Sequence, residues 1–327
     1  MLGAVTVVFF LISLAPGDPA RIMLGERAQK EQIEELREEL GLDKPLVQRY
    51  GIYLLNVVQL DLGKSIFSQR PVVEEMLELF PATIELSLVA ITIATIVGIF
   101  LGSLAAVKRN SPFDYISMSG ALVGVSMPVF WLGLICIMLF SVILDILPTG
   151  GRINARYFFL PITNFYVIDS IILFFQEKDW SYLTSSLLHL VLPASVLATV
   201  PLAVIARTTR SSMLEVLKQD YVRTVRSLGV PRFRIIRVYA LKNAMLTILT
   251  VISIQFGLLL SSAILTETIF AWPGIGRWIY TGIAARDYPV VQGGVILIVG
   301  IFLIINLVVD VVYALVDPRI RITKKAE

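Results

Sequence analysis

Long apolar segments without charged residues constrain this chain more than any other feature. They cover residues 86–107, 115–144, 187–206, 245–266 and 290–309. Each is long enough for a helix that crosses a bilayer, which needs about 20 residues. Only 16% of the residues are charged, against about 25% in soluble domains, and these charges are concentrated between the apolar segments. The pattern predicts an all-α polytopic membrane protein.

A further apolar segment, residues 1–15, is too short to span and ends at the sequence PGDP of residues 16–19. It also has no basic residue before it, as a signal peptide would. We interpret it as the far half of a first transmembrane helix whose beginning is missing from this sequence. The total is then six spans, and we expect the native protein to start earlier, with a basic residue before the first span.

The basic residues indicate which connections face the cytoplasm. Lys108 and Arg109 follow one span, and residues 207–243 form a strongly basic segment between two others. If both are cytoplasmic, so are the N and C termini, including the tail 317–327. The polar region 16–81, which we expect to be helical, and the loop 148–186 are then extracytoplasmic. Within that loop, residues 157–175 are apolar and aromatic, and we interpret them as an interfacial hairpin because a span there would place the two basic regions on opposite sides.

Residues 207–243 have the pattern of two helices joined by an elbow. Val222, Val225 and Leu228 recur at helical spacing, which predicts an apolar face. Gly229 stands where a helix often ends in a left-handed residue, and Pro231 stands where the next helix can begin. An exposed amphipathic helix between two spans suits docking on a soluble partner. The alternative is a basic loop that contacts lipid headgroups.

Polar residues and a proline inside the apolar segments are candidates for lining a pathway. The candidate residues are Ser126, Met127, Pro128, Trp131, Gln255 and Asn306. The alternative is that they form hydrogen bonds or packing contacts between helices. Residues 267–293 are rich in glycine, proline and aromatic residues, and we propose Glu267, Trp272, Pro273 and Gly274 as an outer gate loop. An interfacial aromatic belt is the alternative there.

No residue pattern for catalysis is present. The triplet Gly63, Lys64 and Ser65 resembles the end of a phosphate-binding loop, but Val58 stands where that motif requires glycine. The single cysteine, Cys136, and the single histidine, His189, cannot form a metal cluster. The sequence therefore predicts a non-catalytic chain with no metal and no bound cofactor.

A set of short motifs runs through the chain in a specific order. They are PGDP at 16–19, ELGLDKP at 39–45, DLGKS at 61–65, SMPVFWLG at 126–133, PLAVIARTTRSSMLEVL at 201–217, ETIFAWPGIGR at 267–277, RDYPVVQGG at 286–294 and DPRIR at 317–321. With them the chain resembles the B-type permease of dipeptide and oligopeptide ABC importers. The resemblance implies a type I ABC importer permease fold with six transmembrane helices and a permease domain at 82–316.

The resemblance also implies partners. Residues 207–243 would carry a coupling helix that docks on a separate ATPase subunit, which binds ATP and magnesium. The residues that match this role are Asp220, Tyr221, Arg223, Thr224, Arg226, Gly229 and Pro231. A second homologous permease would complete a heterodimer in a bacterial or archaeal inner membrane, and an extracytoplasmic solute-binding protein would deliver peptide. No nucleic acid is implied.

Two features depart from the general permease pattern. Arg223, Thr224 and Val225 replace Glu-Ala-Ala, and Lys242 replaces a proline; peptide permeases are similar in both. Related permeases carry nickel chelates, glutathione or haem, so the substrate stays open. A self-contained secondary transporter and a channel are alternatives from other classes, and the former would favour inverted repeats, which the sequence does not show.

Overall fold

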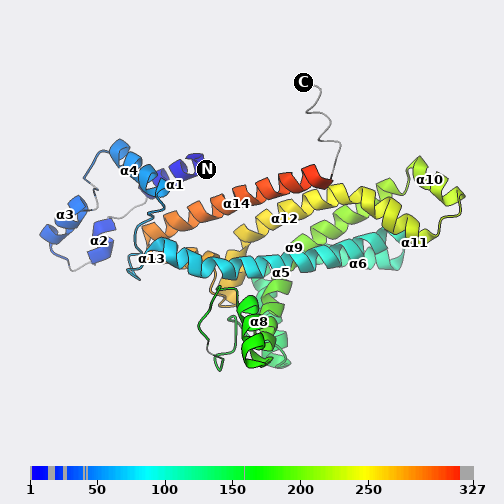
Figure 1. Cartoon of the computed structure of the whole chain (residues 1–327), viewed down its shortest axis with the longest axis horizontal. Helices are drawn as coiled ribbons and strands as arrows, with labels where there is room; N and C mark the ends of the chain where they lie inside the picture. The colour runs from blue at the N-terminus through cyan, green and yellow to red at the C-terminus, as the bar shows by residue number, and fades with distance from the viewer. Residues whose placement is uncertain are drawn as a thin grey trace, which may run out of the picture. The chain divides into compact units, whose positions relative to one another are not determined.

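The computed structural model describes residues 2–13, 19–24, 28–39, 41, 43–157 and 159–316, and these form a helical protein with no strand (Figure 1). The helices are α1 Leu2–Ser13, α2 Pro19–Leu24, α3 Lys30–Glu39, α4 Leu46–Val58, α5 Val72–Val107, α6 Pro112–Ser126, α7 Val129–Cys136, the π-helix η1 Ile137–Ile143, α8 Tyr166–Glu177, α9 Ser181–Val216, α10 Asp220–Ser227, α11 Arg232–Arg234, the π-helix η2 Ile235–Leu241, α12 Lys242–Ile269, α13 Ile275–Ala285 and α14 Tyr288–Val316. The expected tail 317–327 and residues 16–18 lie outside the described residues.

The chain forms two compact units, and each has its own core. One unit contains Met1–Pro81 with Gly274–Leu303, and the other contains Ala82–Pro273 with Ile304–Glu327. We expected the extracytoplasmic region to end at residue 81 and a separate permease domain to follow. Instead, α5 runs unbroken through Pro81, and residues 274–303 join the N-terminal unit.

The reason for this division is apolar packing. Val72 and Met76, in the first turns of α5, are buried against Ile275, Ile279 and Val290 from α13 and α14. Gly293 of α14 leaves room for this contact, because a Cβ there would meet the side chains of Val72 and Met76. The start of α5 therefore packs against α13 and α14 and does not form a separate surface helix.

Four helical segments are long and apolar enough to cross a membrane: Val72–Val107, Ser181–Val216, Arg232–Leu260 and Tyr288–Ile305. A fifth is possible only if α6 and the helix from Val129 to Ile143 count as one span, and these two are bent by 103°. In the segment expected to span at 115–144, the helix is thus interrupted between Ser126 and Val129, at the proline that interrupts the apolar run in the sequence. The described residues therefore contain four or five full-length candidate spans. The twelve residues of α1, in the segment expected to be truncated, do not reach spanning length.

The aromatic stretch 157–175 contains most of one short helix, α8. Helix α8 has 12 residues and is not among the candidate spans. It begins after Phe165 and ends at Lys178, which adopts a left-handed conformation with φ of 57°. Length therefore excludes this segment as a span, whatever its hydropathy.

Small residues on α5 allow α9 to approach closely. Ala90, Ala94, Gly98 and Gly102 recur every four residues along one face of α5. A Cβ on Gly98 would lie 3.0 Å from the Ile205 side chain, and one on Gly102 would overlap the backbone oxygen of Ala206. Small residues at this spacing let helix backbones come together in membrane proteins. The α5–α9 contact, with α12 beside α9, forms the core of the larger unit.

We expect Gly102→Ala to destabilise the protein by about 1–3 kcal/mol, because the backbone of α9 would have to move away. A matched control is Gly120→Ala on α6, where a Cβ meets nothing within 4 Å. That change should be neutral or stabilising by up to about 1 kcal/mol through helix propensity. Thermal unfolding in detergent measures both; equal midpoints for the two variants would contradict the close contact.

Candidate functional site

The basic segment 207–243 folds as the predicted helix, elbow and helix, in the larger unit. Helix α10 ends at Ser227, and Gly229 follows with φ of 77°. The N–H of Gly229 donates to the oxygen of Arg226, and the N–H of Val230 donates to that of Val225. This is the Schellman arrangement, in which a left-handed residue allows the last carbonyls of a helix to be satisfied. Pro231 then caps α11 at its N-terminus.

The N-terminal end of helix α10 is bonded to residues 239 and 243, whereas its C-terminal end is exposed. The Tyr221 hydroxyl donates to the Tyr239 carbonyl oxygen at 3.1 Å and accepts from Asn243 at 3.0 Å. Val222 is fully buried, but Leu228 is 76% exposed. The apolar face expected to include Leu228 is therefore incomplete: this residue is the C-cap, and the turn at Gly229 follows it directly. Leu228 and Phe233, 71% exposed, leave an apolar tip on the elbow.

The charges of α10 face solvent. Asp220 and Arg223 form an ion pair at 3.6 Å, but both side chains are more than three-quarters exposed. Pairs of this kind contribute at most about 0.5 kcal/mol. Thr224 donates its hydroxyl to the Asp220 carbonyl oxygen. Arg226 is exposed and makes no ion pair with any described residue, so the positive charge of the elbow is available to a partner.

The predicted proline interruption is a sharp turn between two helices. Ser126 is the last residue of α6, with its hydroxyl bonded to the Leu122 carbonyl oxygen, and Met127 is extended. Pro128 precedes α7, and Trp131 in its first turn is 46% exposed. The 103° bend therefore coincides with three of the predicted pathway residues.

The other predicted pathway residues lie elsewhere. Gln255 is half-buried in α12, and no hydrogen bond joins it to the bend within the described part of the chain. Asn306 belongs to α14, and its side chain lies outside what the structure describes.

The predicted outer gate residues are more buried than a loop would be. Glu267 lies in α12 with no exposed surface and accepts a hydrogen bond from Thr83 at 2.6 Å. Trp272 is 1% exposed, and its indole N–H donates to the Ala82 carbonyl oxygen at 2.9 Å. Pro273 is the last residue of the larger unit in this stretch, and Gly274 is the N-cap of α13 in the other unit. Residues 275–285, expected to belong to a loop, form α13 instead.

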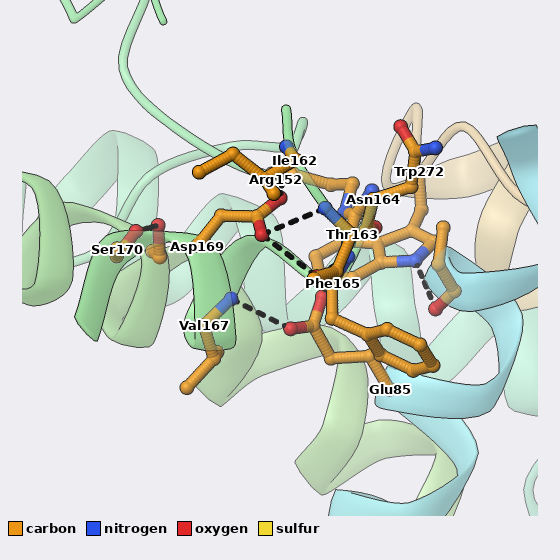
Figure 2. Close-up of polar contacts among 12 residues, drawn as sticks. Glu85, Arg152, Ile162, Thr163, Asn164, Phe165, Val167, Asp169, Ser170 and Trp272 are labelled. Carbon is orange, nitrogen blue, oxygen red and sulfur yellow. Dashed lines mark hydrogen bonds and ion pairs between the residues drawn. The ribbon is translucent and has the colours of Figure 1, made fainter. Parts of the chain in front are cut away.

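A buried ion pair that the sequence analysis did not predict lies beside Trp272. Arg152 donates to Glu85 at 2.6 Å, with the two side chains 4% and 6% exposed (Figure 2). The same guanidinium donates to the Asn164 carbonyl oxygen at 2.8 Å and stacks on Tyr166 at 3.8 Å from the ring centroid. Its Nε has no partner among the described residues.

Both carboxylates of this cluster accept hydrogen bonds from backbone amides of the loop 148–186. Glu85 accepts from the N–H of Val167 at 2.8 Å, and Asp169 accepts from the N–H groups of Ile162 and Thr163 (Figure 2). Loop 148–186 is thus joined to α5 through charge-assisted hydrogen bonds, which are stronger than neutral ones. The only hint in the sequence is that Arg152 and Asp169 are isolated charges among apolar residues.

A second ion pair stands near the elbow. Arg210 of α9 contacts Asp114 of α6 with two hydrogen bonds, at 2.6 and 2.7 Å, and Asp114 is 2% exposed. Asp114 also accepts from the N–H of Asn110 before α6. This bidentate geometry fixes the start of α6 to the end of α9, close in sequence to α10.

Single polar groups elsewhere have structural contacts. The Nδ1 of His189 lies 2.7 Å from the Ser185 carbonyl oxygen, so this nitrogen is the donor. Before the start of α9, hydrogen bonds from the Ser181 side chain and backbone lower the pKa of Asp179. No group of three or more potential metal ligands occurs among the described residues.

Several long apolar helices, a bent helix pair and an exposed basic elbow together define a polytopic helical membrane protein. The fold is similar to that of the methionine ABC transporter MetNI in its inward-facing form, with a TM-score of 0.55 over 72% of this chain and 93% of that one, at 16% identity. The chain belongs to the family described as "Binding-protein-dependent transport system inner membrane component", which matches residues 98–322; its N-terminal companion family matches residues 1–87.

Three curated relatives extend over almost the full length. The chain is 49% identical to the di/tripeptide transport system permease protein DppB of Pseudomonas aeruginosa and to the dipeptide transport system permease protein DppB of Escherichia coli K12. Each of these two matches covers 98% of this chain and 94% of the relative. The DppB of Alkalihalophilus pseudofirmus is 47% identical over 98% of this chain and 95% of its own length.

Proposed function

We propose that this chain is a permease subunit of an ATP-driven importer of dipeptides. The observation that carries the substrate class is the likeness to dipeptide permeases, at 49% identity over 98% of the chain. It favours dipeptides over nickel chelates, glutathione or haem. Membership of a family of binding-protein-dependent transport systems also argues against a secondary transporter or a channel.

The elbow supports coupling to a separate ATPase. Helix α10 is anchored through Tyr221 and Val222, while the apolar tip, Leu228 and Phe233, stays exposed together with Arg223 and Arg226. An exposed apolar tip with a basic rim is the composition of an interface that buries apolar surface and is steered by charge. ATP and magnesium would be bound by that partner and not by this chain.

The remaining partners follow from the same proposal. A second homologous permease completes the pathway as a heterodimer in the cytoplasmic membrane of a bacterium or archaeon, and an extracytoplasmic solute-binding protein delivers peptide. The bend at Ser126, Met127 and Pro128 is the proposed lining, because a turn between apolar helices leaves backbone groups that water or substrate can satisfy. Gln255 and Asn306 stay candidates for the same role, and Glu267 and Trp272 would hold the outer end of α12.

The direct test is uptake in a host that lacks its own dipeptide permease. The chain is expressed with its cognate partner subunits, and entry of a labelled dipeptide is compared with that of a nickel–histidine chelate, glutathione and haem. We expect dipeptide uptake only when the chain and the ATPase are both present. Dipeptide flux driven by an ion gradient in vesicles that contain the purified chain alone would instead show a secondary transporter.

Topology has its own test within the larger unit. Ala155, in the outer loop, and Ser211, near the end of α9, are both exposed. The charge distribution places them on opposite sides of the membrane. Cysteine at position 155 should react with an impermeant thiol reagent in intact cells, and cysteine at position 211 should react only after lysis. Labelling of both from outside would contradict the proposed orientation.

A further inference from the structure

A cavity of about 410 Å³ lies between the last turn of α5 and the elbow. Ala106 and Val107 of α5 form one side of it, and Ile235 and Ile236 of η2 form another. The charged groups in its lining are two guanidinium groups, those of Arg226 from α10 and Arg232 from α11. The cavity thus combines apolar walls with a positive rim and contains no acidic side chain in its lining.

Among the residues that the structure describes, nearby acidic groups do not neutralise the positive charges of these two arginines. Arg226 makes no ion pair within the described part of the chain. Arg232 donates one hydrogen bond to the Val107 carbonyl oxygen at 3.4 Å, which is long for such a bond. Guanidinium groups present a planar set of donors that fits phosphate oxygens in pairs. An anion held here would be contacted from two helices on either side of the Gly229 turn.

The end of the apolar part of α5 indicates the depth of the cavity relative to a membrane. The apolar part of α5 ends at Val107, and the exposed residues Lys108 and Arg109 come directly after it. Lys108 turns back over the Phe113 ring, with its Nζ 5.7 Å from the ring centroid. Basic residues at the end of a spanning helix mark the headgroup region. The cavity, lined by Ala106 and Val107, therefore lies at the depth of lipid phosphates.

We propose that this cavity binds an anionic phospholipid, with its phosphate on Arg226 and Arg232 and its glycerol and first acyl carbons against the apolar walls. A free phosphate ion would satisfy the arginines but leave the apolar walls in water. A lipid satisfies both, and a headgroup bound there would connect the end of α5 to both sides of the elbow. Lipid binding would thus stiffen the segment that reaches the ATPase, beyond the coupling role proposed above.

The test measures lipid retention and needs no ATP turnover, so it stands apart from the proposed function. The complete importer is placed in bilayers of phosphatidylcholine with increasing phosphatidylglycerol, and bound phosphatidylglycerol is counted by native mass spectrometry. Each arginine near an anionic headgroup contributes roughly a fivefold gain in affinity. We expect Arg232→Gln to weaken retention about fivefold and Arg226→Gln with Arg232→Gln about 25-fold, if the two effects add.

The chain offers a matched control in Arg237. It lies in η2, is exposed, and does not line the cavity. Arg237→Gln removes the same charge from the same basic segment and should leave retention unchanged. Equal loss in Arg237→Gln and Arg232→Gln would overturn the proposal, because it would show a diffuse attraction of the basic surface. Arg232→Lys, which keeps the charge, should retain most of the lipid and shows that the position tolerates substitution.

Soluble competitors separate a lipid from a free anion. Inorganic phosphate, added at the concentration of the lipid headgroups, should not displace phosphatidylglycerol from the wild-type importer. Displacement by inorganic phosphate would overturn the lipid assignment in favour of a free-anion site. Binding of phosphatidylcholine equal to that of phosphatidylglycerol would overturn the role of the two arginines.

Discussion

We expect Gly229→Asp to reduce ATP-driven dipeptide uptake roughly 5- to 30-fold while the subunit still inserts and assembles. Gly229 has φ of 77°, where a residue with a side chain costs about 1 kcal/mol or more. A Cβ at this position meets nothing within 4 Å, so no steric clash adds to this cost. The elbow can relieve the strain by changing the direction of α10, and a misdirected helix docks on the ATPase less well. A loss of 1–2 kcal/mol in docking corresponds to this range.

The matched control for that variant is Gly63→Asp. Gly63 has the same φ of 77°, and its nearest neighbour for a Cβ is 3.9 Å away. The Gly63→Asp substitution therefore introduces the same backbone strain and the same negative charge as Gly229→Asp, but outside the basic segment. Uptake, ATPase stimulation by the loaded binding protein, and recovery of the ATPase with the permease are measured for both. Normal uptake by Gly229→Asp would refute coupling through the elbow and favour a segment that only contacts the membrane surface.

Removing one partner of the buried Arg152–Glu85 pair should have the largest effect on stability. In Arg152→Ala, the Glu85 carboxylate stays buried and loses its cation, while Tyr166 loses the stacked guanidinium. Breaking such a pair typically costs about 3–5 kcal/mol. We expect a matching loss of thermal stability, and proteolysis of loop 148–186 at lower temperature than in the wild type.

Two further variants make this prediction specific. Arg156→Ala removes an exposed arginine from the same loop and should change stability by no more than about 0.5 kcal/mol. The double variant Glu85→Leu with Arg152→Met replaces both charges with apolar groups and should recover much of the loss, because no unpaired charge stays buried. A double variant as unstable as Arg152→Ala would mean that the loop depends on the hydrogen bonds to Asn164 and Val167 more than on charge.

The elbow could be predicted because its determinants are local. A left-handed residue after a helix needs glycine, and a proline favours the start of the next helix, so Gly229 and Pro231 mark the turn within a few residues. Four of the five expected spans fall on long continuous helices for a similar reason, since an apolar run near 20 residues is stable as a helix in a bilayer. The 290–309 span is part of one such helix, α14, which extends beyond it at both ends.

Only the tertiary structure decided where helices break and which charges are buried. A proline in an apolar run marks where a helix can bend, but it does not determine the angle, and the 103° turn at Pro128 is seen only in the tertiary structure. The Glu85–Arg152 pair joins residues far apart in sequence, and no local pattern relates them. The close contacts of Gly98 and Gly102 with α9 likewise could not be predicted from the sequence of α5 alone, because they depend on which helix packs against it. Local backbone preference and hydropathy are properties of short segments, whereas burial and pairing arise only when distant segments meet.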